Sequence, residues 1–407
     1  MGQNTGKFFI AALIFCYIVF STTGCGEAEE EYNKAVELME SGKYEDCLKH
    51  FSEAVKKNSE KAEYYIAYGT ALNRTGRYKE AASEFGKAYQ DTDNQISRQN
   101  NKRLYLGQAV AYYGMGESQK ALEACDKALS YGKNNDVDIK IQSIKASVKL
   151  LMGDIAGAEE IYNNIIKEDG SQDGIYLARG RLYQMQGEED KALKDYSSAI
   201  KVSEKCYDAY FAMYEIYTHL GDNSNAEDIL KKLEGMEAET AEEILQLGRV
   251  YYYKGDYKNA KSSFDKSVKG GCNEALYYTG MVYMAEKDYN TAISKFKEYT
   301  GTGSTEKAPE AYNQLAGCYI ELEDFESASA YIDKGMAFGV TDAGMVLGRN
   351  RVVLYERTGK YKKAKKAANS YLEKYPGDHK MEKELEFIKT RIKTMQLAKN
   401  DTRGEQQ

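Results

Sequence analysis

Proline and tryptophan are almost missing from this sequence. Only 2 of its 407 residues are proline and none is tryptophan, whereas average usage of about 5% would give ~20 prolines. Glycine and proline together make up less than a tenth of the chain. These low contents exclude a collagen-like protein and a proline-rich disordered one.

Basic residues are also in deficit. The chain has 56 Lys and Arg against 63 Asp and Glu, a formal net charge of −7 and a pI near 5.4, which argues against nonspecific binding of nucleic acid. Hydrophobic residues make up 42% of the chain, enough for a packed core, while a mean hydropathy of −0.65 excludes a polytopic membrane protein. Tyr supplies 36 aromatic residues and Phe only 12.

Motifs of catalysis and cofactor binding are missing as well. The sequence has no P-loop, dinucleotide-binding, nucleophile-elbow, zinc-protease or C-x-x-C motif. Its three histidines, His50, His219 and His379, are far apart in the sequence. We therefore predict no catalytic residue, no metal site and no cofactor, which indicates a protein that is not an enzyme.

Cysteines do not form a disulfide framework. Beyond the N-terminal segment, five cysteines occur at least 46 residues apart: Cys47, Cys125, Cys206, Cys272 and Cys318. Their odd number and wide spacing favour buried small hydrophobic side chains over the alternative of disulfides.

The N-terminus is typical of an export signal. Lys7 precedes thirteen apolar residues, Phe8 to Phe20, which are too few to span a bilayer. The following residues 21–25, Ser-Thr-Thr-Gly-Cys, resemble a bacterial lipobox, with Thr22 in place of the usual Leu. This resemblance implies a signal peptide over 1–24, lipidation of Cys25 and a tether over 25–30. An uncleaved N-terminal anchor is the alternative.

The remaining chain repeats one pattern. Glycines recur at intervals of 34 to 40 residues, at Gly42, Gly76, Gly116, Gly153, Gly187, Gly221 and Gly255. In most units a small residue stands seven positions before this glycine. An alanine usually stands five positions after the glycine. Aromatic residues recur nine positions after the glycine, as in Phe51, Phe85, Tyr196, Phe264 and Phe296. Such a period indicates a solenoid of helix pairs.

The pattern resembles the tetratricopeptide repeat, a helix-turn-helix unit of 34 residues. Tyrosine replaces the usual Trp of the first helix in Tyr65, Tyr105, Tyr176, Tyr210 and Tyr312, while Lys287 and Glu323 replace the turn glycine in units eight and nine. The resemblance implies an all-α, right-handed superhelical solenoid of ten repeats over residues 31–377. The two substituted turns are expected to be looser, with helix pairing retained.

The pattern changes after residue 377. Met381, Leu385, Ile388, Ile392 and Met395 form one apolar stripe on a charged helix. We predict a capping helix over 378–399, because an open solenoid exposes its last apolar face, followed by a disordered tail over 400–407. A helix that docks a partner is the alternative.

In the tetratricopeptide family the first helices line a concave groove, in which positions 2, 5, 9, 12 and 13 of the unit face a bound peptide. Carried over to this sequence, those positions include the predicted groove residues Arg74, Tyr113, Arg181, Glu215, His219, Arg249, Tyr252, Tyr253 and Tyr277. Arg181, Glu215 and Arg249 occupy position 9 of three successive units and would suit a segment with acidic and apolar side chains. Alternatively, these charges only pair with one another.

The sequence therefore predicts a non-catalytic scaffold that binds protein or peptide partners in its groove. We expect it to be anchored by lipid on the extracytoplasmic face of a cell membrane, in the assembly of envelope complexes, with no nucleic acid and no small-molecule cofactor. A surface lipoprotein that binds glycan or cell wall is the alternative, although most tyrosines fall at positions that the repeat buries.

Overall fold

The computed structural model describes residues 26–304, 307–339, 342–376 and 378–404. This part of the chain is all-helical, with twenty-one helices and no strand. The first helices of successive units are α2 (Glu27–Glu40), α4 (Ala62–Arg74), α6 (Gln95–Met115), α8 (Asn135–Leu151), α10 (Asp173–Met185), α12 (Tyr207–His219), α14 (Ala241–Tyr253), α16 (Glu274–Ala285), α18 (Ala308–Glu321) and α20 (Asp342–Arg357).

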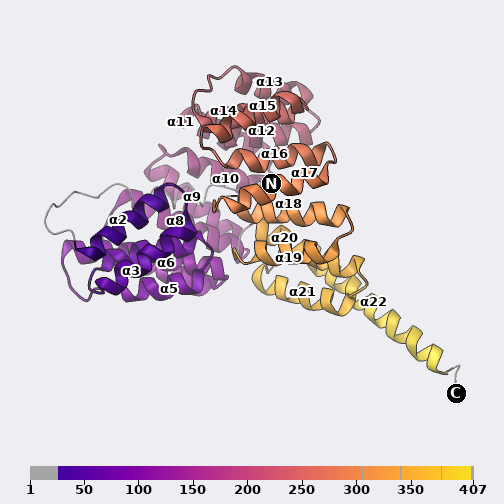
Figure 1. Cartoon of the computed structure of the whole chain (residues 1–407), viewed down its shortest axis with the longest axis horizontal. Coiled ribbons are helices and arrows are strands. Elements are labelled where there is room, and N and C mark those ends of the chain that lie inside the picture. The colour runs from indigo at the N-terminus through magenta and orange to yellow at the C-terminus, as the bar shows by residue number, and fades with distance from the viewer. Residues whose placement is uncertain (1–25, 305–306, 340–341, 377, 405–407) are drawn as a thin grey trace.

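Each first helix is followed by a second helix that packs against it. The second helices are α3 (Tyr44–Lys57), α5 (Tyr78–Lys87), α7 (Ser118–Ser130), α9 (Ile155–Glu168), α11 (Glu189–Val202), α13 (Asn223–Glu234), α15 (Tyr257–Lys269), α17 (Tyr289–Gly301), α19 (Phe325–Met336) and α21 (Tyr361–Lys374); α22 (His379–Gly404) ends the described chain. The predicted solenoid of ten helix pairs is confirmed (Figure 1).

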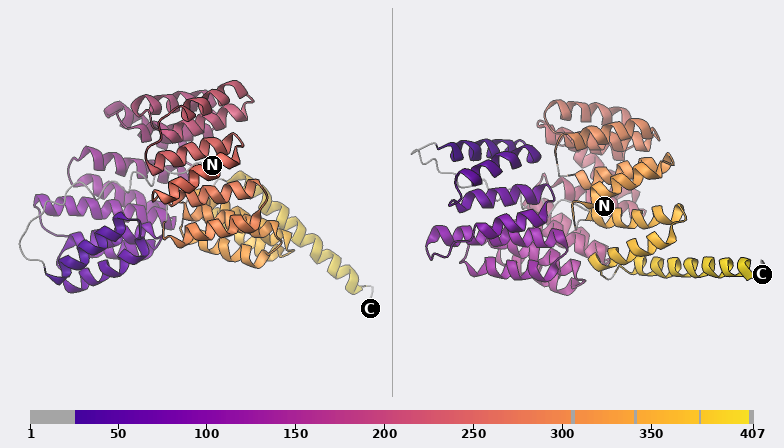
Figure 2. Two further views of the ribbon diagram at one scale, coloured as in Figure 1. Left: turned by 45° about the horizontal axis from the view of Figure 1, so that its top comes forward. Right: turned by 60° about the horizontal axis from the view of Figure 1, so that its bottom comes forward.

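The stack of pairs curves toward its first helices. Neighbouring first helices such as α4 and α6, or α18 and α20, contact one another, whereas contacts between neighbouring second helices are sparse or missing in the described residues. The curve carries the chain around so that α2 to α9 lie beside one another on one side and α16 to α21 on the other (Figures 1 and 2). The inner surface is therefore made by the first helices.

The turn inside each pair needs a left-handed backbone. Seven glycines adopt φ between 73° and 79° at this position, Gly42 through Gly255 of the repeat pattern, where a side chain is disfavoured. Lys287 and Glu323 adopt the same conformation, with φ of 62° and 59°. The expected loosening of these two turns is wrong, because both retain the helix-ending hydrogen bonds of the glycine turns, such as Asp324 N to Tyr319 O at 2.9 Å.

Aspartate begins the second helix in half of the units. The carboxylate of Asp256 accepts from the backbone N–H of Asn259 at 3.1 Å, and Asp288 and Asp324 make the equivalent bonds. Each bond satisfies a helix-terminal N–H that has no partner inside the helix. The turn residue and its neighbour thus fix where one helix ends and the next begins.

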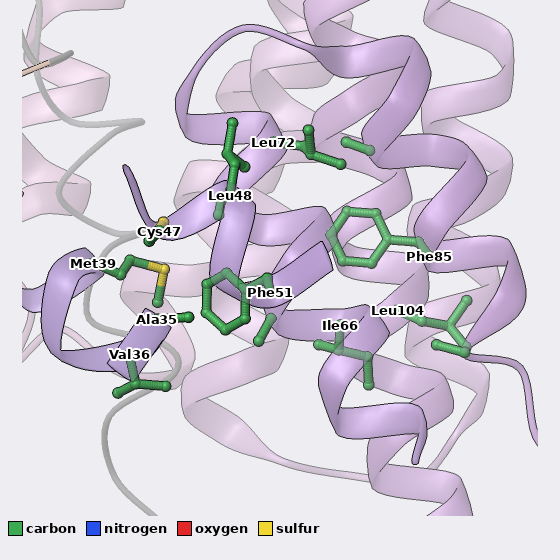
Figure 3. Packing of buried hydrophobic residues seen from close by; sticks show 14 of the residues in the cluster. Ala35, Val36, Met39, Cys47, Leu48, Phe51, Ile66, Leu72, Phe85 and Leu104 are labelled. Atoms are coloured by element: carbon green, nitrogen blue, oxygen red, sulfur yellow. The ribbon is translucent and has the colours of Figure 1, made fainter. Parts of the chain in front are cut away.

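In each of several units an aromatic ring on the second helix packs against a glycine on the first helix, in the space that a Cβ would occupy. At Gly180 and Gly280, a Cβ would lie 2.6 Å from the ring of the aromatic residue sixteen positions later, Tyr196 or Phe296. Both rings are fully buried. Figure 3 shows the equivalent packing in the first units, where Phe51 points toward Ala35 and Phe85 lies between the neighbouring helices. The small residue at this position therefore admits the ring that anchors the pair.

The solenoid also contacts itself between two units that are far apart in the sequence. The hydroxyl of Tyr78 donates to the carbonyl oxygen of Phe338 at 2.9 Å, although 260 residues separate them. The Tyr78 ring lies against Gly114 and Gly339, where a Cβ would overlap it, and Gly76 backs onto Phe338. Units two and three are thereby held against the loop after α19.

The two ends differ from the predicted boundaries. Helix α2 begins at Glu27, inside the predicted tether, because Glu27, Glu29 and Glu30 place negative charge at its N-terminus. Helix α22 continues to Gly404, so residues 400–404 are helical and not an irregular tail. Residues 1–25, with the predicted signal and Cys25, lie outside the described residues.

The first half of α22 covers the last unit as predicted for a cap. Met381, Leu385 and Ile388 are buried in one cluster with residues of α20 and α21, whereas Met395 is 46% exposed. The C-terminal half of α22 projects away from the solenoid (Figure 1).

None of the helices in the described residues combines the length and apolar character needed to cross a membrane.

Candidate partner-binding groove

A single carboxylate links three successive first helices. Asp208 in the first turn of α12 faces Arg181 of α10 on one side and Arg249 of α14 on the other, with N–O distances of 3.5 and 3.6 Å. The three side chains come from units five, six and seven. Every first helix lies on the inner side of the curve, so this chain of charges belongs to the layer of helices in which the groove is predicted.

Arg249 is the most enclosed member of this chain. Its guanidinium lies 3.9 Å from the centre of the Phe211 ring and 5.1 Å from that of Tyr278. One nitrogen donates to Gln246 Oε1 at 2.7 Å, and the side chain is only 12% exposed. Arg249 is therefore a fixed cation–π element beneath the groove surface.

Glu215 contributes a second carboxyl to the same layer of helices. Burial raises the pKa of Glu215, and the positive charges of Arg249 and Arg181 oppose that rise. It forms no ion pair within 4.0 Å in the described part of the chain. The predicted Arg-Glu-Arg row thus exists in space, but Asp208 is the acid that pairs with both arginines.

Tyrosines of the same layer lie on one side of the charges. The Tyr253 ring is 5.3 Å from Phe211, 5.0 Å from Tyr214 and 5.5 Å from Tyr252, measured between ring centres. Tyr214, Tyr252 and Tyr253 are half-buried, so each ring keeps one accessible part. Together with Arg181 they offer apolar area and hydrogen-bond donors in one place.

Tyr277 does not belong to this surface. It is 8% exposed and packs against Tyr278, Phe296 and Tyr299 at 5.2 to 6.2 Å. Burial raises its pKa. The predicted role of Tyr277 as a partner contact is therefore corrected to a core residue of unit eight.

The other predicted groove residues are distributed along the solenoid. Arg74 is half-buried at the end of α4, with its guanidinium 6.0 Å from the Tyr44 ring, and Tyr113 is half-buried on α6. His219 is exposed at the end of α12. The structure thus places Arg181, Glu215, Arg249, Tyr252 and Tyr253 in one cluster, which we call the central groove cluster together with Asp208 and Tyr214.

Sequence reasoning missed Asp208, although a signal for it exists. Asp208 is residue 2 of unit six, one of the groove-facing positions, and the units on both sides carry Arg at position 9. An acid at position 2 between two such arginines predicts the observed bridge. Tyr214 lies outside those positions, and only the structure shows the contact of its ring with that of Tyr253.

Cysteines form no reactive or metal-binding centre in the described residues. Cys47, Cys125, Cys206, Cys272 and Cys318 are all free thiols. Burial raises the pKa of Cys47 and of Cys125 to about 12. Within the described residues, no group of three His, Cys, Asp or Glu side chains is arranged to hold a metal ion.

Family models for the tetratricopeptide repeat match four stretches of the chain. The matched residues are 32–95, 245–307, 309–337 and 351–378. The structure thus shows a helix-pair solenoid, and the units within these four stretches are similar to tetratricopeptide repeats.

Curated relatives are distant. A DnaJ protein P58IPK homolog of Arabidopsis thaliana is 23% identical over 61% of this chain and 54% of its own length. The TPR repeat-containing protein MJ1428 of Methanocaldococcus jannaschii is 21% identical over 77% of this chain and 58% of its own length. The chain spans little more than half the length of these relatives.

Solved structures resemble the fold in part. Yeast Tom70 aligns with a TM-score of 0.46 and 13% identity over 91% of this chain and 90% of its own. A tetratricopeptide repeat protein from Parabacteroides merdae aligns with a TM-score of 0.41 and 18% identity over 60% of this chain and 94% of its own.

Proposed function

We propose that this protein is a non-catalytic scaffold that binds a segment of a protein partner in its groove. The observation that carries the proposal is the central groove cluster, in which Asp208 fixes two arginines beside three half-buried tyrosine rings. Side chains that are held before binding lose little conformational entropy when a ligand arrives. Tyr and Arg are also the residues that dominate protein interfaces.

The charge balance of the cluster determines what it prefers. Two arginines and two carboxyl groups leave no net charge, so a partner gains little from a simple excess of acid. An extended segment with an apolar side chain on the tyrosines and one acceptor toward Arg181 fits best, because Arg181 is 20% exposed and reaches the surface. Arg249 supports Asp208 from beneath.

Site-directed photocrosslinking tests the groove directly. A photoreactive amino acid at His219, exposed on the first helix α12, should give specific protein adducts, whereas the same probe at Lys194, exposed on the second helix α11, should not. The adducts at position 219 should weaken when Arg181→Ala is added and persist with Lys194→Ala. Equal adducts from both probe positions would overturn the groove assignment.

The glycan-binding alternative receives no support from exposed rings. The aromatic side chains exposed beyond a third in the described residues are Tyr89 and Phe387, which lie at opposite ends of the solenoid. Stacking on a sugar needs neighbouring exposed rings. Protein binding is therefore the function that we propose.

We further propose that Cys25 anchors the scaffold by lipid on the extracytoplasmic side of a cell membrane, where it takes part in assembling envelope complexes. The support is the apolar segment Phe8 to Phe20 and the following Thr23-Gly24-Cys25. Intact-mass analysis of membrane-extracted protein should show loss of residues 1–24 and added acyl mass. A Cys25→Ser variant should retain residues 1–24; an unmodified, uncleaved wild-type chain would contradict the proposal.

A further inference from the structure

A second candidate binding site lies in the last unit, at the C-terminal end of the solenoid. A cavity of about 400 Å³ opens between the end of α19, helix α20 and helix α21, within the ~300 to 1,000 Å³ range of ligand pockets. Its lining residues from α20, such as Gly348, Arg351 and Tyr355, sit at positions 4, 7 and 11 of the unit. These are not groove positions, so this site is separate from the central groove cluster.

The cavity opens beside a position at which the last unit lacks an aromatic residue. Gly348 stands at the unit position that holds tyrosine in five other units: Tyr65, Tyr105, Tyr176, Tyr210 and Tyr312. Ala368 stands where six other units have the buried aromatic ring nine residues after the turn, but it is fully buried in the core and does not line the cavity. The ring of Tyr371 fills part of the space, because a Cβ at Gly348 would lie 2.6 Å from it. We call the remaining volume beside Gly348 the socket.

Positive charge surrounds the socket. Helix α21 carries five lysines and one glutamate, a formal charge of +4 on a protein of net charge −7. Lys363, Lys366 and Lys374 line the cavity and are exposed. Among the described residues none of the three has an ion-pair partner within 4.0 Å. The fourth cation, Arg351, pairs with Asp333.

The walls of the socket suit an aromatic ring. Tyr355 of α20 and Tyr371 of α21 both line the cavity, and Ala367 of α21 adds an apolar side chain. Lys363 lies 6.0 Å from the centre of the Tyr355 ring, and the Tyr371 hydroxyl donates to Asp378 at 2.5 Å, which holds that ring in place. An inserted ring would therefore meet fixed aromatic faces beneath a rim of lysines.

We propose that this socket binds an acidic peptide segment of a partner protein by taking up one of its aromatic side chains. The inserted ring replaces the ring that the last unit lacks, and carboxylates flanking it pair with Lys363, Lys366 and Lys374. Aromatic anchors in desolvated pockets supply most of the affinity at such interfaces, and the lysines speed association and set the charge preference.

Peptide binding to the full chain tests the proposal. The probe is a fluorescein-labelled octapeptide with one tyrosine flanked by glutamates, measured by fluorescence anisotropy at low salt. Two control peptides replace the tyrosine by alanine or all glutamates by glutamine. We expect both controls to bind at least tenfold more weakly than the probe.

Variants of α21 locate the binding site. Lys363→Gln with Lys366→Gln should weaken the probe at least fivefold, whereas Lys362→Gln with Lys365→Gln removes the same charge from the same helix outside the cavity and should have less than a twofold effect. Ser370→Phe fills the cavity from an exposed position without changing charge and should also weaken binding at least fivefold.

Each other outcome overturns the proposal. Equal loss in the two lysine pairs would show diffuse electrostatic attraction, and equal binding of the alanine control would show an anion site without an aromatic socket. Binding unchanged by Ser370→Phe, with circular dichroism showing an intact fold, would place the peptide elsewhere. Photocrosslinking at His219 reports on the groove independently, so failure here leaves that function testable.

Discussion

The hydroxyl of Tyr78 donates to the carbonyl oxygen of Phe338, which joins unit two to the loop after unit nine. A solenoid is held together mainly by contacts between neighbouring units. A contact across 260 residues therefore adds a constraint that neighbour packing does not supply.

Removal of the Tyr78 ring should loosen this closure. We expect Tyr78→Ala to raise the radius of gyration measured by small-angle X-ray scattering and to speed amide exchange in residues 335–339. Tyr289→Ala, at the equivalent position of unit eight, is the matched control, because no distant unit contacts Tyr289 in the described residues. If the two variants expand the chain equally, the contact does not hold the superhelix closed.

The turns of units eight and nine offer a stabilising substitution. Glu323 holds a left-handed conformation that costs a side-chain-bearing residue about 1 kcal/mol relative to glycine. Glu323→Gly should therefore raise the free energy of unfolding, measured with urea, by about 1 kcal/mol. Lys287→Gly should have the same effect. Lys194→Gly, at an exposed position inside helix α11, should instead lower the free energy of unfolding by about 1 kcal/mol.

Much of the fold could be predicted because it repeats. The glycine spacing and the aromatic residues recur often enough to give the ten helix pairs even where units eight and nine lack the turn glycine. The ends were less predictable, because they occur once. Helix α2 starts inside the predicted tether, and α22 continues past its buried stripe, since neither boundary repeats elsewhere in the sequence.

The site was predictable only as a set of positions. Transfer of the family's groove positions placed Arg181, Glu215 and Arg249 together correctly, but position alone does not determine burial. Tyr277 is buried because its ring packs against those of Tyr278, Phe296 and Tyr299. Pairing through Asp208 depends on the crossing of three helices, which no single repeat encodes.

The aromatic ring that anchors each unit should have a large energetic role. Phe264 is fully buried against Gly248, and Phe264→Ala should cost about 3 to 5 kcal/mol through lost burial and a cavity. Gly248→Val should also destabilise, because its side chain would overlap the ring. Chemical denaturation followed by circular dichroism measures both. A cost below about 1 kcal/mol for Phe264→Ala would show that the unit repacks around the gap.

The cap should be sensitive to pH. Burial, together with the nearby carboxyl of Glu384 on α22, raises the pKa of Glu356 on α20 to about 7 from an ordinary 4.5. The folded protein then holds this proton more tightly than the unfolded chain, so stability falls as pH rises from about 4.5 through 7. Glu356→Gln should flatten the change of thermal midpoint between pH 5 and pH 8. Glu386→Gln, exposed on α22, is the control and should leave the slope unchanged.

The final prediction separates the two arginines that share Asp208. Arg249 is 12% exposed and stacked on Phe211, whereas Arg181 is 20% exposed and reaches the groove surface. Arg249→Ala should cost about 2 kcal/mol, because it removes a buried guanidinium and its cation–π contacts with Phe211 and Tyr278. Arg181→Ala should cost less than about 1 kcal/mol.

Double-mutant cycles with Asp208→Asn measure the two couplings. We expect a larger coupling for Arg249 than for Arg181, since solvent screens the more exposed pair. Arg249→Lys should recover little of the loss, because an ammonium cannot stack as a planar guanidinium does. If the couplings are equal, Asp208 holds the arginines alike, and Arg249 is no more a structural support than Arg181. A larger coupling for Arg249 leaves Arg181 as the arginine that can be exchanged to alter partner binding without unfolding the groove.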